Sequence, residues 1–423
     1  MNDHPGDDGN APRRGDASAL QGIRVLDLSR VLAGPWCGQL LADLGARVIK
    51  IERPHKGDDC RAWGPPYMVD DDKTPSVESS YYYSCNRGKE SVTVDFTTGE
   101  GRSLIEKLAL ASDVLIENYK VGTLDRHGIG FSQLSKINPG LIYCAITGFG
   151  QDGPYKNQPA YDTIIQGLGG LMSVTGHQDG LPGGGPMKVG LPLIDMMTGL
   201  YAVVAILAAL RRREVTGKGQ YVDISLLDVQ VSSLANVGLN YLVSGDVPVR
   251  KGNRTTSVYP SDAFRCREGY LMLYVSNNER FAEFCKITGL HALLRDARFS
   301  SNQLRLENAD MLAPVITDAL SSRSAPEWIA AFQEAGIPCG PINDISQVFD
   351  DPQVKARNMV IEIAHRSLGK NIPSIANPIR LSESPIQYRR PPPTLGEHTA
   401  QVLSELAGLS SEAISNLSKS GII

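Results

Sequence analysis

Asp195 is the residue of this sequence whose type and position best suit covalent chemistry. It is the only charged residue between Val189 and Leu210, and it stands just before a predicted helix. Aspartate there is a preferred N-cap, because its carboxylate accepts hydrogen bonds from free helix amides. The same position holds a carboxylate ionised and fixes its direction, and an ionised carboxylate can attack an activated carbonyl. Capping and nucleophilic catalysis therefore both stay open.

Basic residues follow several predicted strands, which is the second pattern with chemical meaning. Arg53, Lys89 and Arg126 stand near strand ends, with Arg87 close by. Taken singly, each is more often a solvated surface charge. Gathered at the ends of parallel strands, they could bind the phosphates of an anionic nucleotide such as coenzyme A.

A glycine-rich segment at 148–153 matches the GxGxxG pattern after a predicted strand. Pro154 and Pro159 follow it where a dinucleotide-binding fold needs a helix, so nicotinamide binding is disfavoured. The sequence contains no GxSxG, GxxxxGK[ST], HExxH or CxxC pattern. A serine hydrolase, a P-loop NTPase and a metal site therefore lack support.

The elements that must position these residues alternate between strands and helices, which predicts an α/β protein with a Rossmann-like open parallel sheet. Ligands of such sheets bind beyond the carboxyl ends of the strands, here at 29–35, 53–58 and 118–122. The predicted strands cover 23–28, 47–51, 91–96, 114–117, 141–147 and 220–225. The predicted helices cover 35–45, 99–111, 131–137, 161–175 and 195–213, and a further one ends near 244.

The change of pattern along the chain predicts several parts. A hairpin at 263–275 and three amphipathic helices indicate a smaller α+β domain. The chain then returns to the large domain. The expected parts are a disordered tail at 1–17, a large domain at 18–225, a helix and linker at 226–260, the small domain at 261–345 and a C-terminal segment at 346–423.

Composition restricts the partners. The 423 residues carry 42 Lys plus Arg against 46 Asp plus Glu, a net charge of -4, which argues against nucleic-acid binding. The apolar run from Met196 has 15 residues, short of the roughly 20 that span a bilayer, so we expect a helix buried on all sides. The seven scattered cysteines and the tail without an apolar core predict a cytoplasmic protein.

Long motifs in a fixed order resemble the class III CoA-transferases, the family of formyl-CoA and carnitine CoA-transferases. The opening motifs are RVLAGP at 30–35 and LADLGARVIKIERP at 41–54. The resemblance covers the chain from about residue 18 onward. Its other segments are 86–89, 117–119, 125–126, 147–154, 161–162, 195–199, 216–220 and 341–343.

The resemblance implies a mechanism and a set of site residues. Asp195 matches the catalytic aspartate, which would form a mixed anhydride with the acyl group and then an aspartyl-CoA thioester. A CoA thioester is then a substrate, and no tightly bound cofactor or metal is expected. The implied acyl pocket contains Leu32, Ala33, Tyr161 and Asp162. The implied CoA contacts are Arg53, Lys89, Asn118, Tyr119 and Arg126.

Segments 57–66, 277–278, 340–343 and 390–399 are most similar to succinate–hydroxymethylglutarate (glutarate) CoA-transferases. We therefore expect succinyl-CoA as donor and a small dicarboxylic acid as acceptor. Formyl-CoA transferase has a glutamine in place of Leu32 and a glycine loop in place of 250–254, so formate and oxalate are not expected substrates. Arg254 or Arg61 could meet the distal carboxylate, although a plain surface role is an equal alternative.

Two other functions remain as alternatives. The racemase branch of the family uses a histidine where this chain has Tyr161, and a phenol is a poor base near neutral pH. A CoA-binding protein without turnover is the other alternative. The resemblance also implies an interlocked homodimer, in which 180–194 and 225–260 wrap the partner.

Overall fold

The computed structural model describes residues 18–69, 75–365 and 368–423, so the predicted tail at 1–17 lies outside the described residues. Contacts divide the chain into two compact units, and each is described by itself. The first contains 18–171, 189–245 and 358–423, and the second contains 172–188 and 246–357. The sequence analysis placed the boundaries of the small domain after 260 and after 345, and it assigned 172–188 to the large domain.

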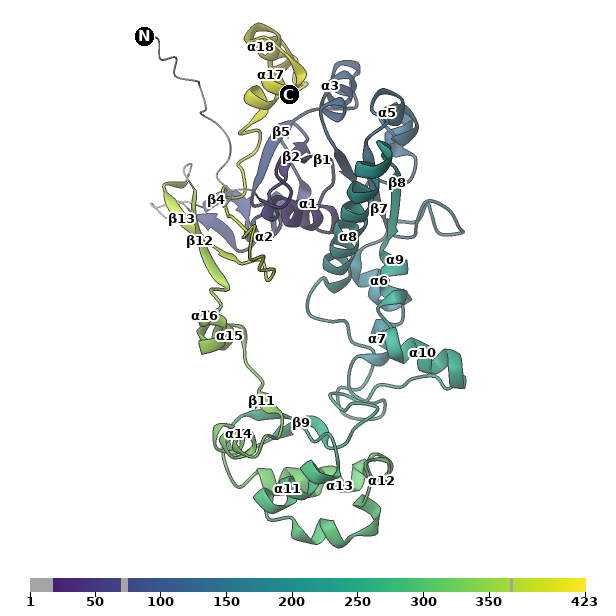
Figure 1. Cartoon of the computed structure of the whole chain (residues 1–423), viewed down its shortest axis with the longest axis vertical. Helices are drawn as coiled ribbons and strands as arrows, with labels where there is room; N and C mark the ends of the chain where they lie inside the picture. The colour runs from purple at the N-terminus through teal and green to yellow at the C-terminus, as the bar shows by residue number, and fades with distance from the viewer. Residues whose placement is uncertain (1–17, 70–74, 366–367) are drawn as a thin grey trace, which may run out of the picture. The chain divides into compact units, whose positions relative to one another are not determined.

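The first unit is built on a six-stranded sheet in the order β5-β2-β1-β6-β7-β8 (Figure 1). All five neighbouring pairs are parallel. This confirms the predicted open parallel α/β sheet. The strands are β1 (Arg24–Asp27), β2 (Arg47–Glu52), β5 (Lys89–Thr93), β6 (Val114–Glu117), β7 (Ile142–Thr147) and β8 (Tyr221–Ser225).

The strand order reverses direction between β1 and β6. From β1 the chain adds β2 and β5 on one side, and it then returns to add β6, β7 and β8 on the other. Leu26 of β1 pairs with both Ile49 of β2 and Leu115 of β6. In open α/β sheets, ligands bind beyond the carboxyl ends of the strands at such a reversal. The loops after β1 and β6 are therefore the expected walls of a site.

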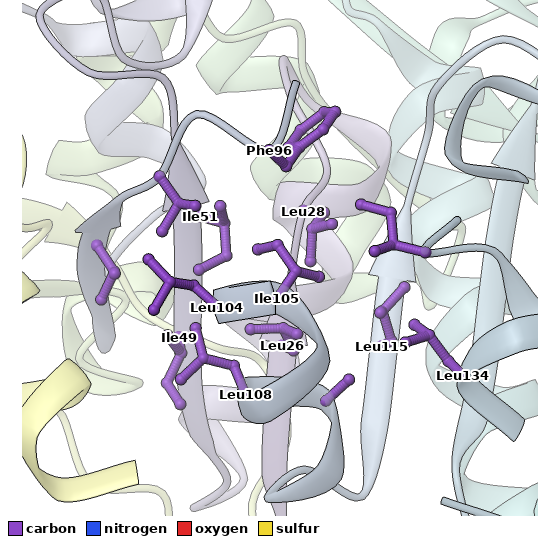
Figure 2. Close-up of a cluster of buried hydrophobic side chains, with 14 of the residues drawn as sticks. Leu26, Leu28, Ile49, Ile51, Phe96, Leu104, Ile105, Leu108, Leu115 and Leu134 are labelled. Atoms are coloured by element: carbon purple, nitrogen blue, oxygen red, sulfur yellow. The ribbon is translucent and has the colours of Figure 1, made fainter. Parts of the chain in front are cut away.

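One face of the sheet packs against α3 (Gly99–Leu110) and forms the core that Figure 2 shows. Leu26 and Leu28 point to this face, because alternate residues of a strand share a face. They meet Leu104 and Leu108 of the helix in a fully buried cluster. Ile49, Leu115, Leu134 and the C-terminal Ile422 and Ile423 belong to the same cluster.

The opposite face packs against α1 (Ala33–Asp43) and α8 (Leu193–Thr216). Val25 and Ile116 point to this face and contact a core that includes Leu41 of α1 and Ile206 of α8. Helices on both faces account for the burial of the central strands along nearly their whole length. Both helices begin at the edge where β1 and β6 end, so each helix start borders the expected site.

Helix α8 has 24 residues and a mean hydropathy of 2.1 over its most apolar window, enough by length and composition to cross a membrane. It lies against the sheet, but the prediction that it is buried on all sides is wrong. Leu200, Tyr201 and Val204 are between 44% and 65% exposed. The helix therefore has one face in the core and one apolar face uncovered in the single chain.

The predicted helix at 161–175 is two helices, α6 (Asp162–Leu168) and α7 (Leu171–Val174). Gly170 between them has a φ of 87°, which a helix cannot accommodate. The helix predicted to end near 244 is likewise divided into α9 (Leu226–Ser232) and α10 (Ala235–Ser244).

The first unit also contains further short helices and two strand pairs. The helices are α2 (Ser80–Ser84), α4 (Thr123–Arg126), α5 (Phe131–Ile137), α17 (Thr399–Ala407) and α18 (Ser411–Lys419). The strand pairs are β3 (Tyr67–Val69) with β4 (Pro75–Ser79) and β12 (Val360–His365) with β13 (Lys370–Ile375).

The second unit contains an antiparallel sheet in the order β11-β10-β9. Its core gathers Phe284, Trp328 and Phe332 against buried strand residues. The predicted hairpin and its three amphipathic helices are confirmed. The elements are β9 (Ser261–Arg265), β10 (Tyr270–Tyr274), β11 (Cys339–Pro341), α11 (Asn278–Thr288), α12 (Asn302–Glu307), α13 (Ala309–Leu320), α14 (Ala325–Glu334), α15 (Ile345–Asp350) and α16 (Pro352–Ala356).

Candidate active site

A cavity of about 500 Å³ lies at the reversal of the strand order, and Asp195 is on its wall. The loops after β1 and β6 both line it. They are joined by Asn118, whose Oδ1 accepts from the Arg30 amide (2.8 Å) and whose Nδ2 donates to the Arg30 carbonyl (2.7 Å). The other lining residues include Val31, Leu32, Ala33, Asp59, Trp63, Tyr119, Lys120, Gly148, Lys156, Ala160 and Tyr161.

The turn after β1 is held in a strained conformation. Val31 has a φ of 70°, which is unfavourable for a β-branched residue. Its amide donates to the buried carboxylate of Asp58, with N–O distances of 3.1 and 3.2 Å. Lys50 Nζ lies 2.9 Å from Asp58 Oδ2 and donates to the Ser29 carbonyl at 2.9 Å. A buried ion pair thus fixes the strained turn that lines the cavity.

Lys89 belongs to the same buried network. Its ammonium group donates to Asp27 Oδ2, Asn86 Oδ1 and the Pro35 carbonyl, each at 2.8 Å. The side chain is fully buried. An ammonium has three donors and all three are used. This position does not fit the predicted CoA contact; Lys89 instead fixes the start of α1.

Asp195 lies in the first turn of α8, two residues after the first helical residue. The alternative role as N-cap is wrong, because the N-cap position is Pro192. The free amides of the helix are bound by another carboxylate. Asp162 Oδ2 accepts from the Ile194 amide at 2.7 Å and from the Asp195 amide at 3.2 Å. Asp195 is therefore free to face the cavity.

The helix start does not keep Asp195 ionised as the sequence suggested. Burial, and then the negative charge of Asp162, raise the pKa of Asp195 to about 7. The positive end of the helix is already neutralised by Asp162, so it offers Asp195 little stabilisation. A carboxylate with this pKa is more basic than an ordinary aspartate, while a large fraction stays ionised near neutral pH.

Close approach of α1 and α8 brings Asp195 to the turn after β1. Gly199 of α8 lies against α1, and a Cβ there would be 2.7 Å from the Ala33 carbonyl oxygen and 3.0 Å from Trp36. Only glycine allows this spacing without a shift of one helix. The glycine four residues after Asp195 therefore helps to set the width of the cavity.

The residues of the predicted acyl pocket separate into two groups. Leu32, Ala33 and Tyr161 line the cavity together with Asp195. Asp162 is only 7% exposed and is bound to α8 and to Gln166. Asp162 therefore lies behind the cavity wall, where it holds the start of α8.

The predicted CoA contacts are also divided. Asn118 and Tyr119 line the cavity. Arg53 pairs with Asp59 of the cavity wall, so it stands at the rim. Arg126, on α4, donates to Thr123 Oγ1 at 3.2 Å and is not on the wall.

Three cations on the wall were not predicted as site residues: Arg30, Lys120 and Lys156. The Arg30 guanidinium lies 5.0 Å from the centre of the Tyr119 ring and pairs with Asp59 at 2.9 Å. Arg30 and Lys120 follow β1 and β6 directly, so strand ends were the signal that could have found them. Trp63 has no comparable signal, because along the sequence it lies well beyond the end of β2.

The two arginines considered for a distal carboxylate have other partners. Arg61 is buried and pairs with Glu52 and Glu78 at 2.7 and 2.5 Å. Arg254, in the second unit, lies 2.7 Å from Asp310 and 3.6 Å from Asp262. Among the described residues, no group of three or more His, Cys, Asp or Glu is arranged to hold a metal ion.

Comparison with known proteins gives a consistent result. The profile of the CoA-transferase family III matches residues 20–399. The chain is 44% identical over 387 residues to a succinate–glutarate CoA-transferase of Agrobacterium fabrum, covering 92% of this chain and 95% of that protein. It is 40% identical over 405 residues to a succinyl-CoA:glutarate CoA-transferase of Mus musculus, covering 96% and 90%.

A solved structure agrees in fold. The crystal structure of a CAIB/BAIF family protein from Brucella suis superposes with a TM-score of 0.82 at 41% identity, covering 92% of this chain and 99% of that one. The fold, the length of the match and the names of the relatives agree. The chain belongs to the CoA-transferase family III and is an enzyme of acyl-CoA metabolism.

Proposed function

We propose that the protein transfers CoA from succinyl-CoA to a small dicarboxylic acid, with Asp195 as the nucleophile. The observation that carries this proposal is the half-buried carboxylate of Asp195 on the wall of a cavity at the reversal of the strand order. The names of two relatives, which act on succinyl-CoA or succinate and on glutarate, support the choice of substrates.

The proposed chemistry balances without another reactant. An Asp195 oxygen attacks the thioester carbonyl, the carbon–sulfur bond breaks, and CoA thiolate leaves a mixed anhydride. The thiolate attacks the Asp195 carbonyl and releases succinate, which gives an aspartyl-CoA thioester. The acceptor carboxylate then reverses both steps, producing its own CoA thioester and regenerating Asp195. Two easier steps replace one difficult exchange.

Residues of the cavity have defined tasks in this scheme. Arg30, Lys120 and Lys156 are the cations of the wall, and they would bind phosphates or carboxylates. Backbone amides in the first turn of α1, which begins at the cavity wall, would stabilise the oxyanion that forms at the attacked carbonyl. The racemase alternative lacks the histidine that this branch uses, because no histidine lines the cavity in the described part of the chain.

An assay of acceptors tests the proposal. We expect transfer from succinyl-CoA to glutarate, and little transfer to formate or oxalate. D195A should abolish transfer, by more than about 10⁴-fold, while CoA still binds. The matched control is D223N, which removes a carboxylate beside the same edge of the sheet but outside the cavity. Near-normal transfer by D195A, or deuterium exchange at the α-carbon without an acceptor, would refute the proposal.

We also propose that the enzyme is a cytoplasmic homodimer. Support for the dimer comes from the uncovered apolar face of α8 and from Ile164 and Leu168 of α6, which are 57% and 53% exposed. Apolar faces of this kind mark interaction sites. Light scattering after size-exclusion chromatography should give twice the chain mass of 45.7 kDa, and a monomer would refute the dimer.

A further inference from the structure

The carboxylate of Asp162 occupies the start of the helix that carries the proposed nucleophile. Its Oδ2 accepts from the amides of Ile194 and Asp195 at 2.7 and 3.2 Å. The side chain is buried, although Asp162 is itself the first residue of another helix, α6. One carboxylate thus joins the starts of α6 and α8.

The other oxygen of Asp162 is held by Gln166, one turn further along α6. Gln166 Nε2 donates to Asp162 Oδ1 and to the Leu191 carbonyl. Its Oε1 accepts from the Val189 amide at 2.9 Å. Gln166 is fully buried, so these bonds are shielded from water. Asp162 and Gln166 together fix the chain that leads into Asp195.

Few charged groups act on Asp195 besides Asp162. Tyr81 of α2 is the other titratable group whose pKa is coupled to Asp195; burial, and then Asp195, raise the pKa of Tyr81, which keeps the phenol neutral. The cations of the cavity wall are not among the groups that shift Asp195. Among the residues that the structure describes, Asp162 is therefore the charged group that acts on the proposed nucleophile.

We propose that Asp162 is a positioning residue of the transfer reaction, held by Gln166, that fixes the direction of the Asp195 carboxylate and sets the pH at which it acts. This inference rests on the proposed role of Asp195 as nucleophile. The two effects have different origins and can be separated. Direction comes from the bonds to the α8 amides, whereas the pH comes from repulsion between two carboxylates.

The first test compares the pH dependence of kcat/KM for wild type and D162N, with succinyl-CoA and glutarate. Asparagine retains an oxygen that accepts from the α8 amides but carries no charge. Removal of the like charge favours the ionised form of Asp195, so the acidic limb should move about one unit to lower pH. A variant that only damaged the structure would lower the plateau and leave the limb in place.

The second test uses D162E and Q166L, which keep the charge. Either change shifts the carboxylate or frees it, so the plateau should fall roughly 10²-fold while the limb stays at the wild-type pH. If D162N does not fold, D162S replaces it, because serine is also a preferred residue at helix starts and is neutral. Thermal unfolding and CoA binding, measured on every variant, report its fold.

The results distinguish this inference from the proposed function. If wild type forms no CoA adduct and transfers no CoA, the proposed function fails. If wild type is active but the acidic limb of the kcat/KM profile of D162N or D162S lies at the wild-type pH, Asp162 does not set the pH at which Asp195 acts. A wild-type plateau in both D162E and Q166L overturns the positioning role.

Discussion

Two groups of carboxylates lie on or behind the wall of the same cavity, and their surroundings are opposite. Asp27 and Asp58, below the turn after β1, each pair with a buried lysine at 2.8 to 2.9 Å. Burial alone would raise their pKa values, but the lysines hold the pKa of both carboxyls below the usual range. Asp195 has a like charge in place of a cation, and its pKa rises to about 7.

The charge beside each carboxylate determines whether it holds the structure or is suited to react. A carboxylate paired with a buried lysine is a fixed acceptor for backbone amides and a poor nucleophile. A carboxylate next to another carboxylate has higher free energy in its ionised form, and that energy is relieved when the oxygen forms a covalent bond. The same residue type thus holds the turn in one group and is suited to attack a carbonyl in the other.

Breaking a carboxylate–lysine pair below the turn after β1 should have the largest effect on stability. K50M leaves the buried Asp58 without its cation, and removal of one partner of a buried ion pair costs about 3–5 kcal/mol in the free energy of unfolding. Urea unfolding measures this. The control is R211A, whose pair with Glu214 is 76% and 65% exposed and should contribute less than about 1 kcal/mol. Equal losses in the two variants would contradict the comparison.

Widening the space between α1 and α8 should have the second largest effect, which is on catalysis. G199A places a methyl group against Ala33 and Trp36, so α8 must move and carry Asp195 away from the turn. We expect kcat to fall roughly 10²-fold with a small change in KM. G99A is the control, because a Cβ there would meet its nearest atom at 3.9 Å. Unchanged kcat in G199A would show that the contact does not set the geometry.

Removing the charge of Asp195 should stabilise the protein at high pH. The folded pKa of about 7 is above the ordinary 3.8, so the folded state binds a proton that the unfolded state releases. That stability is present at low pH and is lost as pH rises through 7. The free energy of unfolding of D195N, relative to that of wild type, should therefore rise between pH 5 and pH 8 by on the order of 1–3 kcal/mol.

Thermal unfolding at the two pH values checks this gain. D223N, outside the cavity, serves as the control for a general effect of charge. A difference between D195N and wild type that is constant with pH would mean that Asp195 has an ordinary pKa.

The smallest effect is expected for Y161F. Tyr161 is on the cavity wall and 66% exposed, and the proposed chemistry needs no proton from its hydroxyl. We expect kcat within about threefold of wild type, measured by transfer to glutarate. A collapse of activity would instead give Tyr161 a catalytic role in the transfer.

Local patterns predicted most of the fold. The strand Val114–Glu117 and the helix Phe131–Ile137 have the bounds that the sequence indicated, because their apolar periods and end residues are contained within them. The breaks at Gly170 and after α9 were missed, since an apolar period can continue across a short interruption.

The site was predicted less completely, because its charges are matched across long distances in the chain. Lys89 has the basic character of a phosphate contact, but its partner Asp27 is 62 residues earlier. The amide of Asp195 is bound by Asp162, 33 residues earlier. No local pattern shows that one carboxylate will take the helix start and leave the other to face the cavity.

Mass spectrometry of the intact protein tests the central claim most directly. The enzyme is mixed with succinyl-CoA without an acceptor, at pH 6 and pH 8, and treated with hydroxylamine before peptide mapping. We predict a CoA adduct that becomes a hydroxamate on Asp195, and faster formation at pH 8 because more of the carboxylate is ionised. An unmodified Asp195 in an enzyme that still transfers CoA, or a hydroxamate on another residue, would contradict the account.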